Sequence, residues 1–258
     1  YCKIEYGGGN GLGNICFDNA SSTKALDHMT ISNSSSYGIY AANASFNLHY
    51  SNIYSNVLGG MNNTTPNTLP AECNWWQDGS GPSGAGPGTG QAISNYVEYD
   101  PWLAESYSSI FYFNGISVSP DSPRPRAFSQ NGGSAIIKAK ISEHADWSIS
   151  IKNDTAAEVY NAAGAGTVVS HSWYGQNNSG KALANGVYEY TASAKNPAGL
   201  TASFRGRLKL DNSLPAVKVS SPIAYEEISG IWDIIGTVSG TNFSSYRFEY
   251  SLNTQTPQ

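Results

Sequence analysis

Acidic side chains are the residues of this chain whose chemistry could act on a substrate. Paired carboxylates can serve as general acid and base, and lyases add basic groups that take a proton and neutralise uronates. Over residues 1–105, Lys3 and Lys24 are the only Lys or Arg side chains. No two acids occupy matched repeat positions, so we expect solvated or turn-capping roles, Asp78 and Asp100 being turn caps. The acids considered are Glu5, Asp18, Asp27, Glu72, Asp78, Glu98 and Asp100.

Histidine and cysteine offer few ligands for a metal. His28 and His49 are separated by close to one repeat length, a spacing that would let them stack on one face of a repeat. Asp78 and Asp211 are weak calcium candidates because each lies beside further oxygen ligands. With no CxxC pair, we otherwise predict no metal and no cofactor. Free cysteine behaves as a small apolar residue, so all three are expected to be free and buried: Cys2, Cys16 and Cys73.

Two adjacent tryptophans precede a run dense in Gly and Pro that extends to Gly90. Neighbouring residues of a strand face opposite sides, so only one indole can enter a given core layer. We expect a plug that closes the end of the fold, formed by Asn74, Trp75, Trp76, Pro101 and Trp102. The alternative is a glycan platform, since an exposed aromatic face stacks well on a sugar ring. Its candidates are Trp75, Trp76, Tyr40 and Tyr54.

The composition favours a β protein with many turns. Charged residues make up 13% of the 258 residues, whereas Tyr, Trp, Gly, Asn and Ser are abundant. The formal charge is −5 overall and −6 over residues 1–105, so no basic stripe is available and nucleic-acid binding is not expected. No apolar run is long enough to predict a membrane span. Because the chain opens directly on strand-like sequence, we expect a piece of a longer precursor.

Residues 1–105 contain a weak internal repeat. Isoleucines recur at positions 4, 31 and 53, and again at positions 15 and 39, so that their intervals fall in the twenties. Such spacing is typical of a solenoid in which one repeat forms one coil. Each coil must turn sharply where left-handed backbone favours Gly or Asn, and we assign these turns to Gly7, Gly8, Asn33 and Asn56.

The rest of the chain reads as strands separated by turn residues. Over 106–211 short alternating segments recur at the intervals of a β-sandwich. From 212 to 258 a second such unit begins with "PAVKVSSP", "IWDIIGTV" and "YRFEYSL", and we expect it to be truncated. The predicted fold class is all-β, a coil stack joined to one sandwich and to the start of another.

Residues 71–103 carry the most specific resemblance. Asn74, Trp75 and Trp76, the Gly/Pro loop to Gly90, and the string from Tyr99 to Leu103 resemble the segment that closes the last coil in right-handed parallel β-helix repeat proteins. These are the pectin-lyase-like solenoids of bacterial and archaeal secreted and surface proteins. The resemblance implies that residues 1–105 are the last coils and C-terminal cap of a parallel β-helix.

Residues 106–211 resemble the FlgD-like immunoglobulin-type domain. The carrying segments are "ADWSISI" at 145–151, "NGVYEYTASAKNPAG" at 185–199, and Trp173 with Gly175 and Gly180. The family's Trp–Gly segment is usually richer in Asp, and "WYGQNNSG" has none, which removes support for a cation bound there. Residues 212–258 resemble a further Ig-like unit.

Together these features predict a non-catalytic structural or adhesive segment of a large secreted or cell-surface prokaryotic protein, such as a stalk, surface layer or fibre. The alternatives are an accessory part of a polysaccharide-active lyase or hydrolase whose catalytic coils lie upstream, or a glycan-binding module. The expected partners are other copies or fragments of the same precursor and cell-surface glycans. Sequons for N-glycosylation occur at Asn19, Asn33, Asn43, Asn62, Asn63, Asn153, Asn177 and Asn242.

Overall fold

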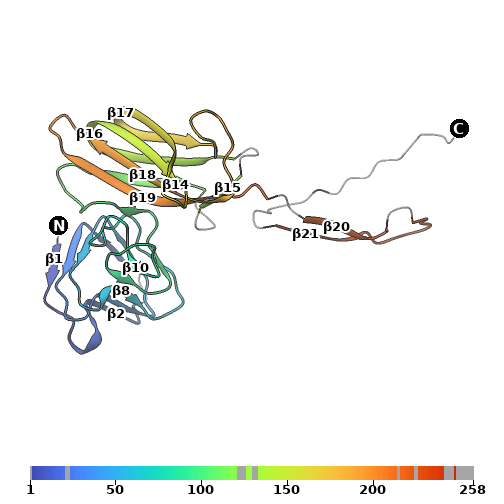
Figure 1. Ribbon diagram of the computed structural model, residues 1–258. Coiled ribbons are helices and arrows are strands. Elements are labelled where there is room, and N and C mark those ends of the chain that lie inside the picture. The colour runs from blue at the N-terminus through green and yellow to red at the C-terminus, as the bar shows by residue number, and fades with distance from the viewer. Residues whose placement is uncertain are drawn as a thin grey trace.

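The computed structural model describes residues 2–20, 24–120, 126–129, 133–213, 216–223, 226–240 and 247. These residues form parallel and antiparallel β-sheets (Figure 1), with one short 3-10 turn, η1 (Gly9–Gly11), and no α-helix among them. The predicted all-β class is therefore confirmed. Over the described ranges, no helix has the length and apolar character needed to cross a membrane.

The N-terminal part is a stack of coils in which the chain visits the same parallel sheets in turn. One sheet contains β1 (Cys2–Glu5), β4 (Met29–Ser32) and β7 (Asn52–Tyr54). A second contains β2 (Gly13–Asp18), β5 (Tyr37–Ala42), β8 (Gly59–Asn63), β11 (Ala92–Ile93) and β10 (Ser83–Gly84). Two further pairs complete the stack: β3 (Lys24–Asp27) with β6 (Phe46–His49), and β9 (Leu69–Pro70) with β12 (Val97–Glu98).

Apolar ladders run through the stack and form its core. The isoleucines used to detect the repeat are in register, since Ile4 pairs with Ile31 and Ile31 with Ile53. In the second sheet Ile15 pairs with Ile39, which pairs with Met61. Strands this short cannot bury a face alone, so each coil depends on the ladder contacts with its neighbours.

Left-handed residues recur at the corners of successive coils. One corner column comprises Tyr6, Asn33 and Ser55, and a second comprises His28, Tyr50 and Cys73. The expected turn positions Gly8 (φ 89°) and Asn33 (φ 55°) are left-handed, but in the next coil Ser55 (φ 55°) takes this role instead of Asn56. Asn56 is buried, where its Oδ1 accepts from the Ser34 amide and its Nδ2 donates to the Ile31 carbonyl.

The antiparallel part encloses a second core. Its main sheet has the order β13 (Trp102–Leu103), β19 (Thr201–Leu210), β18 (Gly186–Lys195), β16 (Ala135–Lys152) and β14 (Phe113–Ser119). Two strands lie off this path: β17 (Glu158–Trp173) pairs with β16, and β15 (Arg126–Phe128) pairs with β19. In β19, buried residues alternate strictly with less buried ones. This two-residue period is expected of a strand in a sheet with one covered face.

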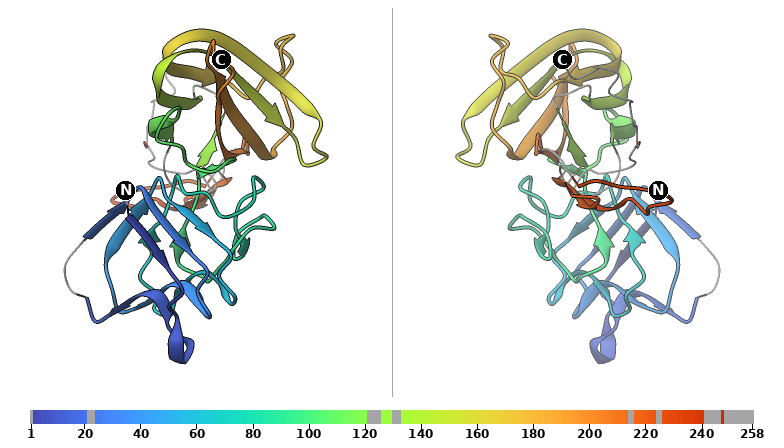
Figure 2. Two further views of the ribbon diagram at one scale, coloured as in Figure 1. Left: turned by 90° about the vertical axis from the view of Figure 1, so that its left-hand side faces the viewer. Right: turned by 90° about the vertical axis from the view of Figure 1, so that its right-hand side faces the viewer.

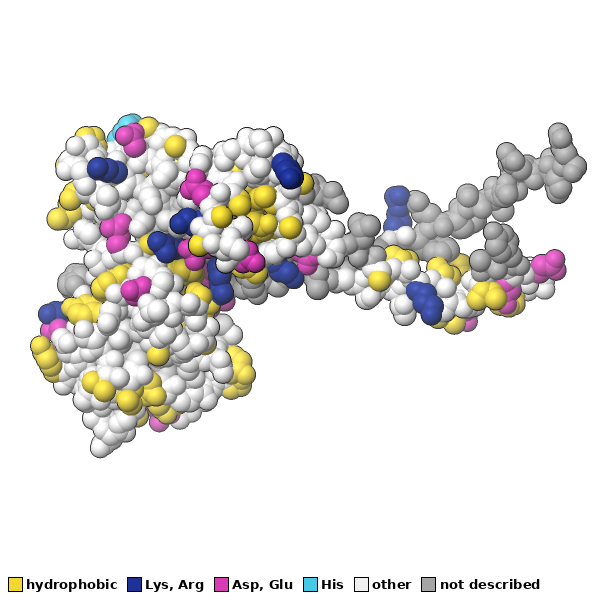
Figure 3. Space-filling view, viewed as in Figure 1, with side chains coloured by type: hydrophobic (Ala, Val, Ile, Leu, Met, Phe, Trp, Pro, Cys, Tyr) yellow, Lys and Arg dark blue, Asp and Glu magenta, His cyan; other side chains and the backbone are white. Residues whose placement is uncertain are grey.

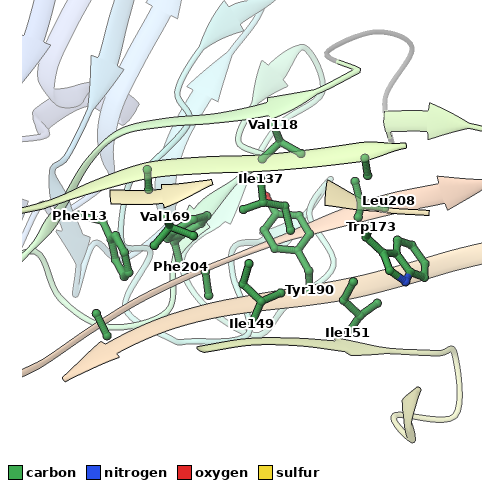
Figure 4. Close-up of a cluster of buried hydrophobic side chains, with 14 of the residues drawn as sticks. Phe113, Val118, Ile137, Ile149, Ile151, Val169, Trp173, Tyr190, Phe204 and Leu208 are labelled. Atoms are coloured by element: carbon green, nitrogen blue, oxygen red, sulfur yellow. The ribbon is translucent and has the colours of Figure 1, made fainter. Parts of the chain in front are cut away.

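Aromatic and branched side chains from these strands meet inside the antiparallel part. Figure 4 shows Phe113, Ile137, Tyr190 and Phe204 directed toward one another, and the Phe113 and Phe204 ring centroids are 5.0 Å apart. Both views of Figure 2 show this part seated on one side of the coil stack.

A two-stranded hairpin follows, formed by β20 (Ala216–Ser221) and β21 (Ile235–Ser239), and extends away from the antiparallel part in Figure 1. It carries many exposed apolar side chains, seen as yellow patches in Figure 3 and including Val217, Ile223, Ile231 and Trp232. The hairpin matches the first two strands expected after residue 212. The third, at 246–252, lies outside the described residues except for Arg247.

Candidate functional site

The coil stack and the antiparallel part meet at a junction where segments distant in sequence are joined by hydrogen bonds. Cys73 donates its amide to the Pro101 carbonyl (2.6 Å), and Leu103 donates to the Asn74 carbonyl (3.0 Å). Leu103 also pairs with Phe204 of β19, and Ala104 donates to the Ser203 carbonyl (3.0 Å). Backbone hydrogen bonds therefore run without interruption from the last coil into the antiparallel sheet.

Asn74 organises the last coil at this junction. Its fully buried side chain donates from Nδ2 to the carbonyls of Leu48 (2.6 Å) and Ala71 (2.8 Å), and its Oδ1 accepts from the Ser51 amide (2.9 Å). The amide thus provides hydrogen-bond partners for three backbone groups of two successive coils. An amide is suited to this position because it both donates and accepts.

The two adjacent tryptophans face different cores. Trp76 is fully buried in the core of the coil stack. Trp75 is partly buried, packs against the antiparallel core, and has its ring centroid 5.9 Å from that of Tyr54. Of the suggested glycan contacts, Trp76 has no exposed face, whereas Trp75 and Tyr54 form a partly exposed pair. Tyr40 is partly buried on β5, in a different sheet from Tyr54.

The Gly/Pro loop covers Trp102. This residue is fully buried, and its indole nitrogen donates to the Gly79 carbonyl (3.1 Å). Gly81 has φ +96°, and a Cβ placed there would lie 2.9 Å from the Trp102 ring. The loop is rich in glycine here because backbone must approach the indole closely.

A charged cluster joins the end of the last coil to β19. Asp100 is 3% exposed, accepts from the Arg207 amide (3.2 Å), and has its Oδ2 3.8 Å from Arg207 Nε. The guanidinium also donates to the Tyr99 hydroxyl and lies over the Tyr99 ring, 5.7 Å from its centroid. Burial raises the pKa of Tyr99, although the nearby Arg207 charge opposes that shift. The expectation that Asp100 caps a turn is therefore incomplete, because its carboxylate binds a strand more than one hundred residues away.

Tyr107 joins the coil stack at a second edge of the junction through hydrogen bonds and ring contacts. Tyr107 donates its amide to Asn52 Oδ1 (2.7 Å), and its carbonyl accepts from Asn52 Nδ2 (3.2 Å). Its ring packs edge-on against His28, with centroids 5.0 Å apart, and His28 stacks on Tyr50. Burial raises the pKa of Tyr50 to about 12.

Titratable side chains line up on three successive coils beside this edge. His49 lies between two acids, with Nδ1 3.7 Å from Asp27 Oδ1 and Nε2 3.3 Å from Glu72 Oε2. The expectation that no acids share matched coil positions is wrong, because Asp27 and Glu72 flank the same imidazole. The spacing of His28 and His49 would have let them stack, but His28 is one position further along and stacks on Tyr50.

A cleft of about 590 Å³ opens between this row and the antiparallel part. That volume is within the range of ligand clefts. One wall comes from the coils and carries His49 and Glu72, and the other comes from β14 and β16 and carries Lys138. The remaining lining residues are Tyr50, Cys73, Pro101, Ile116, Ser117, Val118, Ser119 and Ile136. The imidazole, the carboxylate and the lysine can all form hydrogen bonds with a ligand in this cleft.

The two calcium candidates have protein partners. Asp78 Oδ1 accepts from the amide (2.8 Å) and hydroxyl (2.6 Å) of Ser80, hydrogen bonds that lower the pKa of Asp78. Asp211 lies 3.1 Å from Lys209 Nζ and accepts from the Ser213 amide. Among the described residues, no group of three or more His, Cys, Asp or Glu is arranged to hold a metal ion.

The cysteines differ in part from expectation. All three are free, but Cys2 and Cys16 are exposed and Cys73 is buried. Cys2 and Cys16 lie on β1 and β2, which are the terminal strands of their sheets, so fewer neighbours cover them.

Sequence reasoning missed the row of Asp27, His49 and Glu72, although its signal was present. Each member of the row follows the previous one by close to the length of one coil, but their types differ and a search for repeated acids passes over the histidine. A comparison of the chain with protein-family models and with the curated proteins found no match.

Proposed function

We propose that the chain is a non-catalytic structural or adhesive segment of a large secreted or cell-surface prokaryotic protein. In this proposal residues 1–105 are the last coils of a right-handed parallel β-helix with its cap at 71–103. Residues 106–211 form a FlgD-like Ig-type sandwich, and residues 212–258 begin a second Ig-like domain. The segment acts outside the cell as a stalk, surface-layer or fibre component.

Two features support the architecture. Parallel strands recur at about one coil length with isoleucine above isoleucine, which is the pattern of a solenoid. The antiparallel strands that follow are long, alternate in burial and enclose an aromatic core, as sandwich strands do.

The observation that carries the mechanical role is the continuous junction. A flexible linker between domains has few crossing contacts. Here backbone hydrogen bonds pass from Asn74 through Leu103 to β19, and Asp100 and Arg207 add a charged contact. Such a connection transmits force between the two units instead of allowing a hinge.

A second function, contact with a polysaccharide, is favoured by one specific observation. Asp27 and Glu72 flank His49 at the edge of the cleft, and paired carboxylates are used by glycoside hydrolases. The exposed part of the Trp75–Tyr54 pair offers a separate aromatic contact.

Small-angle X-ray scattering tests the mechanical role. We expect one compact two-unit shape for the unmodified chain and a wider distribution of inter-unit distances for Arg207→Ala combined with Asn52→Ala. Lys195→Ala, an exposed substitution, is the control and should change nothing. If the unmodified chain already samples many inter-unit distances, the proposed mechanical role is wrong. Incubation with a polysaccharide panel separates the alternative, because release of products by this chain would make it an enzyme.

A further inference from the structure

Three five-residue turns in the sandwich share one hydrogen-bond pattern. They span residues 153–157, 177–181 and 196–200, and each begins with asparagine. In each turn the asparagine amide donates to the carbonyl of the fifth residue, at 2.9 to 3.0 Å, and the fourth residue donates back to the asparagine carbonyl. The fifth residue's amide then donates to the asparagine Oδ1, at 2.8 to 2.9 Å. The fourth residue is left-handed in all three.

Two of these turns have an additional hydroxyl contact. The Thr155 hydroxyl donates to Asn153 Oδ1 (2.8 Å), and the Ser179 hydroxyl donates to Asn177 Oδ1 (2.8 Å). The backbone amides of Thr155 and Ser179 donate to the same oxygens. These oxygens therefore accept three hydrogen bonds each, whereas within the described part of the chain neither Nδ2 atom has a hydrogen-bond acceptor.

The third turn has no hydroxyl side chain at its third position. Pro197 and Ala198 follow Asn196, so no hydroxyl reaches its Oδ1. Asn196 is 6% exposed, and its Nδ2 donates to Glu143 (2.6 Å). The turn thus forms without the hydroxyl, which shows that Thr155 and Ser179 are not required by the backbone geometry.

A side-chain amide nitrogen is a poor nucleophile because its lone pair is delocalised onto oxygen. Hydrogen bonds to that oxygen stabilise the negative charge that develops when the nitrogen loses a proton and attacks. Asn153 and Asn177 combine such donors with a partly exposed position and with the Asn-x-Ser/Thr pattern of glycan acceptors.

We infer that Asn153 and Asn177 are acceptor sites for N-linked glycans. The co-reactant is a polyprenyl-diphosphate-linked oligosaccharide, presented by a transferase. Asn Nδ2 forms a bond to the anomeric carbon while the bond from that carbon to the diphosphate oxygen breaks. The diphosphate leaves with the electron pair, and the amide proton passes to a base of the transferase. This inference goes beyond the proposed function and does not depend on it.

The remaining described sequons are less suited to the reaction. Asn63 is 5% exposed and donates to the carbonyls of Asn67 (2.7 Å) and Tyr96 (3.0 Å). In the sequon at Asn62, the Thr64 hydroxyl donates a hydrogen bond to the Ala41 carbonyl. At the other sites the amide nitrogen donates to a side chain: Asn19 to Asp18, Asn33 to Glu5, and Asn43 to Asn19. Asn242 lies outside the described residues.

The experiment uses the folded chain, a purified single-subunit oligosaccharyltransferase and a lipid-linked N-acetylglucosamine oligosaccharide. Peptide mass spectrometry measures the occupancy of each sequon. We expect occupancy at Asn153 and Asn177 to exceed that at Asn63 at least tenfold. Synthetic peptides covering 58–68 and 148–160 should both accept the glycan, so that a low value at Asn63 in the chain reports its burial.

Matched variants separate the two sites from each other. Asn153→Gln should remove only the first glycan and Asn177→Gln only the second. Thr155→Ser and Ser179→Thr keep the hydroxyl and should remain acceptors, whereas Thr155→Val should not. The inference is overturned if the peptides are modified but Asn153 and Asn177 of the folded chain are not. It is equally overturned if Asn63 in the folded chain is modified as readily as they are.

Discussion

The carboxylate of Asp100 accepts a hydrogen bond from the backbone amide of Arg207, 107 residues further along the chain. The same oxygen faces the Arg207 guanidinium, which in turn contacts Tyr99. One acidic side chain at the end of the coil stack thereby fixes the position of β19 in the antiparallel sheet. Because Asp100 is almost fully buried, this contact is little screened by solvent.

Removal of that carboxylate should destabilise the protein. We expect Asp100→Ala to lower the free energy of unfolding by about 2 kcal/mol, because a buried charge-assisted partner of Arg207 is lost. Urea denaturation at neutral pH measures the change, and Asp154→Ala, in an exposed turn, is the control. A double-mutant cycle with Arg207→Ala should give a coupling energy of at least about 0.5 kcal/mol. Additive effects would show that the two residues act independently.

Asn74 should be among the most sensitive polar positions of the coil stack. We expect Asn74→Ala to lower the free energy of unfolding by about 3 kcal/mol, because three buried backbone groups lose their partners at once. Asn95→Ala, on an exposed loop, should change it by less than about 0.5 kcal/mol. Thermal denaturation followed by circular dichroism provides the comparison. Equal effects of the two substitutions would contradict the role assigned to Asn74.

Several parts of the fold were predictable because they depend on local pattern. The isoleucine spacing identified strands that the structure places in register, and the opposite facing of Trp75 and Trp76 follows from the two-residue period of a strand. Left-handed turns were only partly predictable. Asn56 has the right residue type for the turn, but its side chain is needed inside the stack, so Ser55 adopts the strained conformation instead.

The candidate site was less predictable because it depends on contacts between distant segments. Asp27, His49 and Glu72 come together only when three successive coils are stacked, and a one-residue slip would bring His28 there instead. No local pattern pairs Asp100 with a residue 107 positions away. The opposite wall of the cleft comes from β14 and β16, whose docking on the coils has no sequence signal of its own.

The glycine at position 81 should resist substitution for two separate reasons. We expect Gly81→Ala to lower the free energy of unfolding by more than about 1 kcal/mol, since the backbone is left-handed and the added methyl meets Trp102. Gly11→Ala is the matched control, because Gly11 is also left-handed (φ +75°) but a Cβ there meets no atom within 4 Å. The difference between the two variants in urea denaturation isolates the contact with the indole. If both variants lose the same amount, the loop does not pack on Trp102 as described.

Tyr50 should make stability fall at alkaline pH. Its pKa is raised from 10.0 to about 12 by burial, so the unfolded phenol ionises before the folded one. The contribution of Tyr50 is therefore fully present below pH 10 and is lost as the pH rises from 10 toward 12. We expect Tyr50→Phe to flatten this part of the pH profile of unfolding free energy, whereas Tyr174→Phe, at an exposed position, should leave it unchanged. A Tyr50→Phe profile as steep as that of the unmodified chain would contradict the assignment.

The shared turns of the antiparallel part allow a test of backbone strain within one protein. Ala156 and Gly180 occupy the same fourth position, with φ values of 60° and 80°. A left-handed conformation costs a non-glycine residue about 1 kcal/mol, a cost that Gly180 avoids. We therefore expect Ala156→Gly to raise the free energy of unfolding by about 0.5 kcal/mol, the gain being reduced by the greater entropy of glycine in the unfolded chain. Gly180→Ala should lower it by about 0.5 kcal/mol for the same reasons in reverse. Opposite signs for these two substitutions, measured by urea denaturation, are the expected result, and equal signs would show that the turns are not equivalent in energy.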